Sequence, residues 1–118
     1  MNHECYVSLE VAKLLKEAGF DWECTHKYER SIIACRYEDY EKPTLSVAQR
    51  WLRVVKGIHL YVRPMLDEHK YVVTVVVDDL TWGQVIDSNG TSKRFNTYEE
   101  AQEAGIKKAL EIILEQGE

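Results

Sequence analysis

The sequence predicts an α+β fold: an antiparallel sheet of three or four strands with helices packed mainly on one face, in the element order α-ββ-α-βββ-α. Apolar residues recur at helical spacing in three separate stretches, each with start or stop signals. Between these stretches lie short segments of strand-forming residues that end in turn signals. The 118 residues fit a single domain, 1–118, with a helix–hairpin annex at 1–42 and an α-β-β-β-α core at 43–118.

The first helix is expected to begin after Ser8, because a serine hydroxyl can accept a hydrogen bond from a free backbone N–H of the first turn. The apolar stripe that follows consists of Val11, Leu14, Leu15 and Ala18. Gly19 can supply the left-handed position after the helix, and Phe20 can then fold back onto the last turn.

A hairpin is expected next. In residues 22–28, aromatic residues, a cysteine and a histidine alternate with charged and hydroxyl residues. Residues 31–37 are rich in strand-forming residues. Glu29-Arg30 between them predicts a tight turn. Residues 37–43 are polar and are expected to form a connection.

The second helix is expected to start at Thr44, its N-cap, and to end at Gly57. Its buried stripe is predicted to be Leu45, Ala48, Leu52 and Val55, widened by Val47 and Trp51.

Strands follow this helix. Residues 58–63 alternate between apolar and polar side chains, and their Ile, Leu and Val residues are expected to face inward. Residues 71–77 are β-branched at nearly every position, which predicts a central strand. A third strand is expected within residues 81–86, and an Asn89-Gly90 turn leads to a short return strand at 92–95.

The last helix begins with a capping box made by Thr97 and Glu100. Its core-facing residues are predicted to be Ala101, Ile106, Leu110, Ile113 and Leu114. Gly105 lies inside this helix at a cost of about 1 kcal/mol relative to alanine, which indicates close contact with another element.

The charge is unevenly distributed along the chain. A net charge of −5 disfavours general binding to nucleic acids or anionic membranes. However, residues 43–66 contain no acid, and their basic residues are Arg50, Arg53, Lys56 and Arg63. A basic middle therefore separates two acidic ends.

The protein is expected to be cytoplasmic. No secretory pattern opens the sequence, and no apolar run approaches the ~18 residues that a membrane span needs. The three cysteines are an odd number without metal-binding spacing, so free thiols are expected. No cofactor-binding motif is present in the sequence.

Three stretches carry a resemblance when taken together: residues 14–21, residues 43–53 and residues 97–106. The combination resembles a family of small uncharacterised proteins from Bacteroidetes genomes and from their phages and mobile elements. The resemblance covers nearly the whole chain. It implies an origin, and it transfers neither an activity nor a catalytic residue.

Two partial likenesses concern shorter stretches. Residues 44–114 have the α-β-β-β-α order of a double-stranded-RNA-binding domain, but residues 97–100 are acidic where that family carries lysines that hold phosphate. Residues 97–101 are also similar to the antitoxin half of HicA/HicB-type pairs, and a capping box alone produces most of that pattern.

Two functional hypotheses arise from surface residues. The candidates for nucleic-acid binding are Arg50, Arg53, Lys56 and Arg63, with Trp51 or Tyr61 able to stack on a base. The competing interpretation is a solvated helix face with Trp51 in the core. The candidates for a protein interface or self-association are Tyr37, Tyr40 and Tyr61, because tyrosine combines contact area with a polar group.

Catalysis and metal binding are weaker hypotheses. Asp78 and Asp79 follow the central strand, where carboxylates can hold Mg²⁺, but they also suit a turn. Cys24 and His26 lack the paired spacing of zinc sites. We therefore assign no catalytic or metal-binding residue, and expect a non-enzymatic accessory or interaction protein of phage or mobile-element origin.

Overall fold

The computed structural model describes residues 5–24, 26–32, 36–77, 82–85 and 93–116. In chain order its elements are α1 (Leu9–Glu17), β1 (Lys27–Ile32), β2 (Arg36–Glu41), α2 (Leu45–Trp51), the π-helical turn η1 (Leu52–Lys56), β3 (His59–Met65), β4 (Lys70–Val76), β5 (Trp82–Gln84) and α3 (Tyr98–Gln116). Mixed helices and antiparallel strands confirm the predicted α+β class. None of the helices in these ranges has the length and apolar content to cross a membrane.

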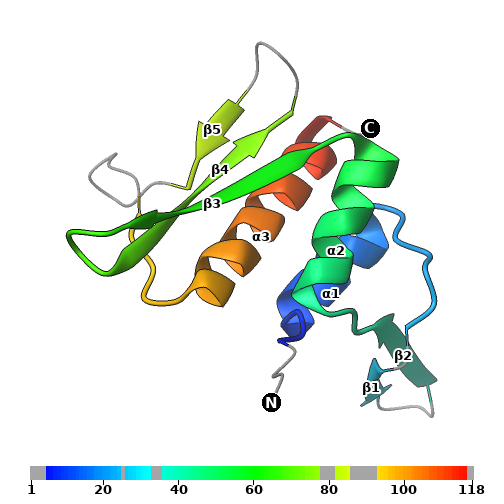
Figure 1. Ribbon diagram of the computed structural model, residues 1–118. Coiled ribbons are helices and arrows are strands. Elements are labelled where there is room, and N and C mark those ends of the chain that lie inside the picture. Colours follow the sequence, from blue (N-terminus) through cyan, green and yellow to red (C-terminus); the bar gives the residue numbers. More distant parts are fainter. Residues whose placement is uncertain (1–4, 25, 33–35, 78–81, 86–92, 117–118) are drawn as a thin grey trace.

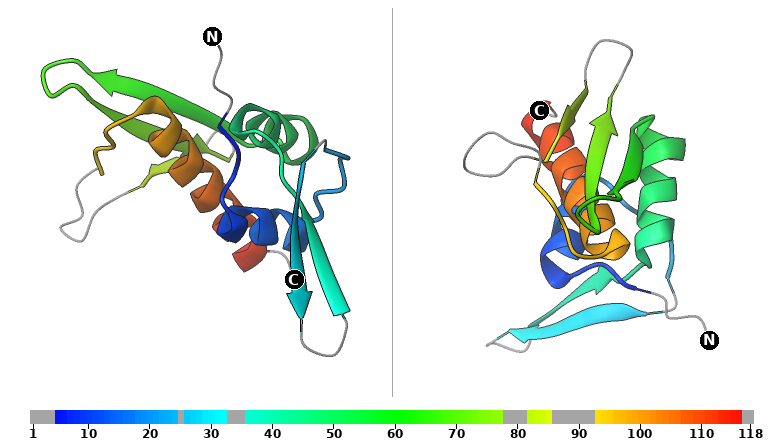
Figure 2. Two further views of the ribbon diagram at one scale, coloured as in Figure 1. Left: turned by 90° about the horizontal axis from the view of Figure 1, so that it is seen from below. Right: turned by 60° about the vertical axis from the view of Figure 1, so that its left-hand side comes forward.

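Among the described residues, β3, β4 and β5 form an antiparallel sheet in that order, while β1 and β2 pair as a separate hairpin (Figure 1). The prediction of a central strand at 71–77 is therefore confirmed. Helix α3 packs across one face of the β3–β4–β5 sheet, α2 lies beside β3, and α1 packs against α3 (Figures 1 and 2).

A single hydrophobic cluster joins the helices to the sheet. Its fully buried side chains include Val11, Leu15, Trp51, Leu52, Val75, Ile106 and Leu110. Helix α1 therefore shares its core with the C-terminal helix, and the β1–β2 hairpin is the peripheral part of the N-terminal region (Figure 2).

Gly105 marks the point where α3 crosses the sheet. A Cβ atom at this position would lie 2.6 Å from Cγ2 of Val73 and 3.5 Å from Cδ2 of Leu60. The expectation of a close contact here is confirmed, and only glycine allows α3 to approach β4 so closely.

The predicted helix caps are present. The hydroxyls of Ser8, Thr44 and Thr97 accept hydrogen bonds from the backbone N–H three residues later, at 3.1–3.2 Å. At the end of α1, Gly19 has a φ of 99°, and the N–H of Phe20 donates to the Leu15 carbonyl at 2.9 Å. These ends form as predicted because each is fixed by a few neighbouring residues.

Helix α1 is also capped by a distant residue. The backbone N–H of Ser8 donates to Oε2 of Glu103 at 2.7 Å, although the two residues are 95 positions apart. In a local capping box the carboxylate belongs to the same helix. Here it comes from α3, so the start of α1 depends on the packing of the two helices.

The hairpin exists, but its predicted turn is wrong. Glu29 and Arg30 lie inside β1, where they pair with Asp39 and Glu38 of β2, so no turn forms at Glu29-Arg30. Tyr37 and Tyr40 lie in β2 and not in a polar connection. A period of two identifies a strand without fixing its register, and the charges of β2 are tolerated because this hairpin lies outside the core.

The predicted return strand at 92–95 pairs as expected only at its start. Phe95 exchanges both backbone hydrogen bonds with Tyr71 of β4, each at 2.8 Å, and the Lys93 N–H donates to the Val85 carbonyl. Residues 93–95 therefore begin beside the end of β5 and then pair with β4 at Phe95. The Asn89-Gly90 turn lies outside the described residues.

Candidate interaction surface

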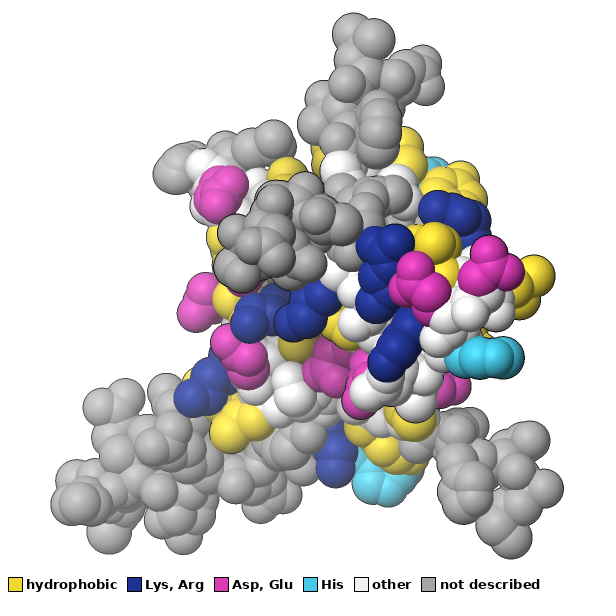
Figure 3. All heavy atoms as spheres, turned by 90° about the vertical axis from the view of Figure 1, so that its left-hand side faces the viewer, with side chains coloured by type: hydrophobic (Ala, Val, Ile, Leu, Met, Phe, Trp, Pro, Cys, Tyr) yellow, Lys and Arg dark blue, Asp and Glu magenta, His cyan; other side chains and the backbone are white. Residues whose placement is uncertain are grey.

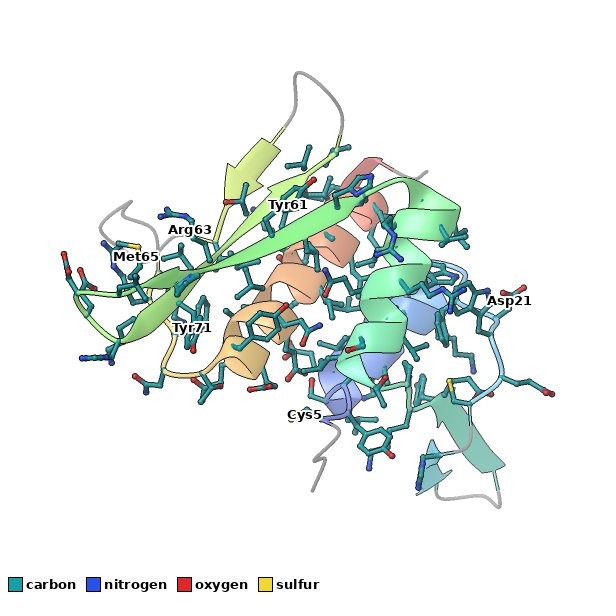
Figure 4. The ribbon with its side chains drawn as sticks, viewed as in Figure 1. Cys5, Asp21, Tyr61, Arg63, Met65 and Tyr71 are labelled. Carbon is teal, nitrogen blue, oxygen red and sulfur yellow. The ribbon has the colours of Figure 1, made fainter. Side chains whose placement is uncertain are left out.

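The β3–β4–β5 sheet has two different faces. Opposed residues of an antiparallel pair project to the same side, so the Leu60–Val75 and Val62–Val73 pairs face α3, while Tyr61 and its partner Thr74 face away from it. Figure 4 shows Tyr61 and Arg63 projecting from β3 on the side opposite to α3. Among the described elements, no helix covers that second face, which we call the bare face, although Val72, opposite Arg63 on this face, is only 2% exposed.

The π-helical turn η1 determines which residues of the second helix are exposed. A π turn takes one more residue per hydrogen-bonded ring than an α turn, so side chains after it are rotated relative to an ideal helix. Leu52 at its start is buried, whereas Val54 and Val55 are 60% and 50% exposed. The expectation that Val55 lies in the buried stripe is therefore wrong.

Three arginines lie on this part of the molecule. Arg50, Arg53 and Arg63 are exposed, and within the described part of the chain no ion pair forms to any of them. Lys56 is exposed too, with its Nζ 5.6 Å from the centre of the Trp51 ring. Trp51 itself is 1% exposed, so the hypothesis that it stacks on a base is wrong.

These residues come from adjoining parts of the chain, because β3 follows η1 after Gly57 and Ile58 and starts at the end of that helical stretch (Figure 1). The Gln49 side chain of α2 donates to the Leu60 carbonyl, which holds the start of β3 against α2. We call this region the α2–β3 surface and define it by Arg50, Arg53, Val54, Val55, Tyr61 and Arg63. It combines exposed apolar groups with cations that form no ion pair within the described residues. On the side shown in Figure 3, basic and acidic side chains are interleaved. Elsewhere among the described residues, Arg94 and Glu68 form an ion pair at 3.1 Å.

The three predicted interface tyrosines are not brought together. Tyr61 is 58% exposed on the bare face. Tyr40 is half-buried in the hairpin, where Nζ of Lys16 lies 5.1 Å from its ring centre. Tyr37 also belongs to β2, so the hairpin tyrosines and Tyr61 lie in different sheets.

The outer edge of β3 is partly closed. Nε2 of Gln49 in α2 donates to the Leu60 carbonyl at 3.3 Å, and Nε2 of the buried Gln102 donates to Oε1 of Gln49 at 2.7 Å. Because alternate residues of an edge strand turn their peptide groups outward, Pro64 occupies an outward position where it offers no N–H. The edge is thus protected against pairing with another strand, and the side chains of the α2–β3 surface remain available.

A separate pocket of about 470 Å³ lies where the hairpin meets α2. Its lining includes Tyr6, Glu23, Cys24, His26, Lys42 and Val47. The Cys24 thiol donates to the Trp22 carbonyl at 3.6 Å, and the His26 ring packs edge-on against Tyr6 at 5.0 Å. The thiol and the imidazole therefore each contact a neighbouring residue of the fold.

Among the described residues, carboxylates and possible metal ligands form no second candidate site. Asp78 and Asp79 lie outside the described residues. In the part of the chain that the structure does describe, no group of three or more His, Cys, Asp or Glu side chains is arranged to hold a metal ion.

Sequence reasoning found the arginines and Tyr61 but missed Val54 and reversed the environment of Val55. Their exposure depends on the π turn, which no pattern in the sequence predicts. Comparison with protein-family models, curated proteins and solved structures finds no match, so the surface is interpreted from its own geometry.

Proposed function

We propose that this chain is a non-enzymatic interaction protein that binds a protein partner through the α2–β3 surface. The observation that carries the proposal is the exposure of Val54 and Val55 beside Arg50 and Arg53. Exposed aliphatic groups gain most from contact with other apolar groups, while arginine and tyrosine are enriched among residues that dominate protein interfaces. π turns also occur frequently at functional sites.

The setting of this activity follows from two further features. The free, exposed thiol of Cys5 suits a reducing compartment, which supports action in the cytoplasm. The resemblance of residues 14–21, 43–53 and 97–106 to proteins of Bacteroidetes phages and mobile elements supports a mobile-element origin.

Site-specific photo-crosslinking tests the proposal. A photoreactive amino acid replaces Val54 in the full chain, which is produced in its native cells, and a matched variant carries the same group in place of exposed Lys108 on α3. We expect a discrete protease-sensitive adduct from position 54 alone, and its loss when Arg53→Glu is added. An adduct that nuclease removes, or equal adducts from both positions, would contradict the proposal.

Nucleic-acid binding is a second candidate, favoured by the placement of Tyr61 and Arg63 on the same bare face. An exposed aromatic ring beside cations can stack on an unpaired base. Anisotropy of labelled single-stranded and duplex DNA and RNA, at roughly 50 and 200 mM salt, separates the two candidates, since phosphate-driven binding falls steeply over that interval. Binding that is lost in an Arg50/Arg53/Lys56→Ala variant would favour the nucleic acid.

A further inference from the structure

We infer that the partner is an acidic amphipathic helix of another protein, and not a second copy of this chain; this rests on the proposed protein-binding function. The inference concerns the chemistry of the occupant. It follows from the charges of the α2–β3 surface, from the symmetry of protein dimers and from the shape of α2 and η1.

The charge of the surface selects an acidic partner. Residues 43–66 carry four basic residues and no acid, and Arg50, Arg53 and Arg63 have no ion pair within the described residues. The rest of the chain is acidic enough to give a net charge of −5. Guanidinium groups bind carboxylates in a planar two-bonded geometry, so Asp or Glu side chains are the complementary groups.

Symmetry disfavours a second copy. In the common two-fold dimer the same patch meets itself, so each arginine of the surface would face the cationic patch of the other subunit. Like charges brought together in an interface are destabilising. An arrangement that joins this surface to an acidic face of the next copy is a head-to-tail contact, which generates a ring or a filament and not the common two-fold dimer. A second strand at the β3 edge is disfavoured as well, because Gln49 and Pro64 obstruct that edge.

The shape of the surface selects a helix. Arg50, Arg53, Val54 and Val55 are all exposed along the helical stretch 45–56, so cations and aliphatic groups occur together along it. This stretch is roughly 18 Å long at 1.5 Å per residue. A partner helix of about three turns, with acidic and aliphatic residues at three- and four-residue spacing, would match it in length and in pattern.

The test uses the full ¹⁵N-labelled chain and a synthetic peptide of about 15 residues in which Glu and Leu recur at helical spacing. A peptide of the same composition in scrambled order is the control. In two-dimensional amide spectra we expect the amphipathic peptide to shift the resonances of residues 50–63, and the scrambled peptide to bind about tenfold more weakly. Arg53→Glu should weaken binding by about tenfold, whereas Lys108→Glu on α3 should leave it unchanged.

The outcomes separate this inference from the proposed function. Sedimentation velocity of the chain alone, over a range of concentrations, should show no association that Arg53→Glu abolishes. If such association occurs, the inference is overturned while the proposed protein-binding function stands. If the amphipathic peptide fails to shift residues 50–63, the acidic helix is also excluded, and the crosslinking at position 54 decides the proposed function independently. If oligonucleotides alone shift these residues, both are overturned.

Discussion

The two faces of the β3–β4–β5 sheet differ although they are built from alternate residues of the same strands. The face toward α3 holds Leu60, Val73 and Val75, all buried, and it tolerates so little added volume that a glycine is required at position 105. The bare face carries exposed Tyr61 and Arg63 on β3, beside the buried Val72 of β4. The comparison shows that one strand can place stabilising and interacting residues one position apart, because its side chains alternate between the faces.

The largest loss of stability is expected from replacing Leu60, which lies on the face of the sheet that packs against α3. Leu60→Ala should lower the free energy of unfolding by about 2–5 kcal/mol, because the removed atoms leave a cavity against α3. Denaturant unfolding followed by circular dichroism measures the change. A loss no greater than that of Tyr61→Ala would show that the two faces do not differ in this way.

A smaller loss is expected when volume is added to the covered face. Gly105→Ala should destabilise the protein by about 1–3 kcal/mol through overpacking, partly offset by the better helix propensity of alanine. The cause is the contact that the new Cβ would make with Val73. In the Gly105→Ala/Val73→Ala double variant the two losses should be clearly less than additive. Strict additivity would mean that the two positions do not touch.

The cap between α3 and α1 should have a still smaller effect. Glu103→Ala removes the acceptor of the Ser8 N–H and should cost about 1 kcal/mol, within the range of measured N-cap losses. Glu103→Gln keeps an acceptor oxygen and should cost less. Thermal unfolding of both variants provides the measurement, and equal losses would indicate that the carboxylate charge matters and the hydrogen bond does not.

The smallest effect on stability is expected at the exposed valine. Val54→Ser should change the free energy of unfolding by no more than about 0.5 kcal/mol, because the side chain already lies in water. The same variant should reduce binding of the amphipathic acidic peptide. A large loss of stability would instead show that the Val54 side chain contributes to packing of the core, and it would no longer count as part of the interaction surface.

Local signals in the sequence predicted much of this fold. The caps at Ser8, Thr44 and Thr97, the end of α1 at Gly19 and the close contact at Gly105 all depend on short stretches of chain. The alternation of β3 was also readable, since burial on one face enforces a period of two.

The incorrect predictions depend on contacts that are distant in sequence or on local irregularity. Phe95 pairs with Tyr71 across 24 residues, and nothing near Phe95 indicates this partner. The register of the hairpin depends on how β1 and β2 pair and on the contact of β2 with α1, and neither can be read from the alternating pattern. The exposure of Val55 follows from a single π turn. In the interaction surface, the sequence therefore indicated the charges and Tyr61 but not the apolar groups between them.

The hydrogen bond from Ser8 to Glu103 has a consequence for how the protein is made. A ribosome completes α1 early, yet the carboxylate that caps it is added 95 residues later. At bacterial and eukaryotic elongation rates this interval is roughly 5–20 s. During that time the Ser8 hydroxyl can still cap the helix locally, but the Ser8 N–H lacks its carboxylate and no α3 covers the apolar stripe of α1. The first helix therefore gains its full packing only after the last helix has been made.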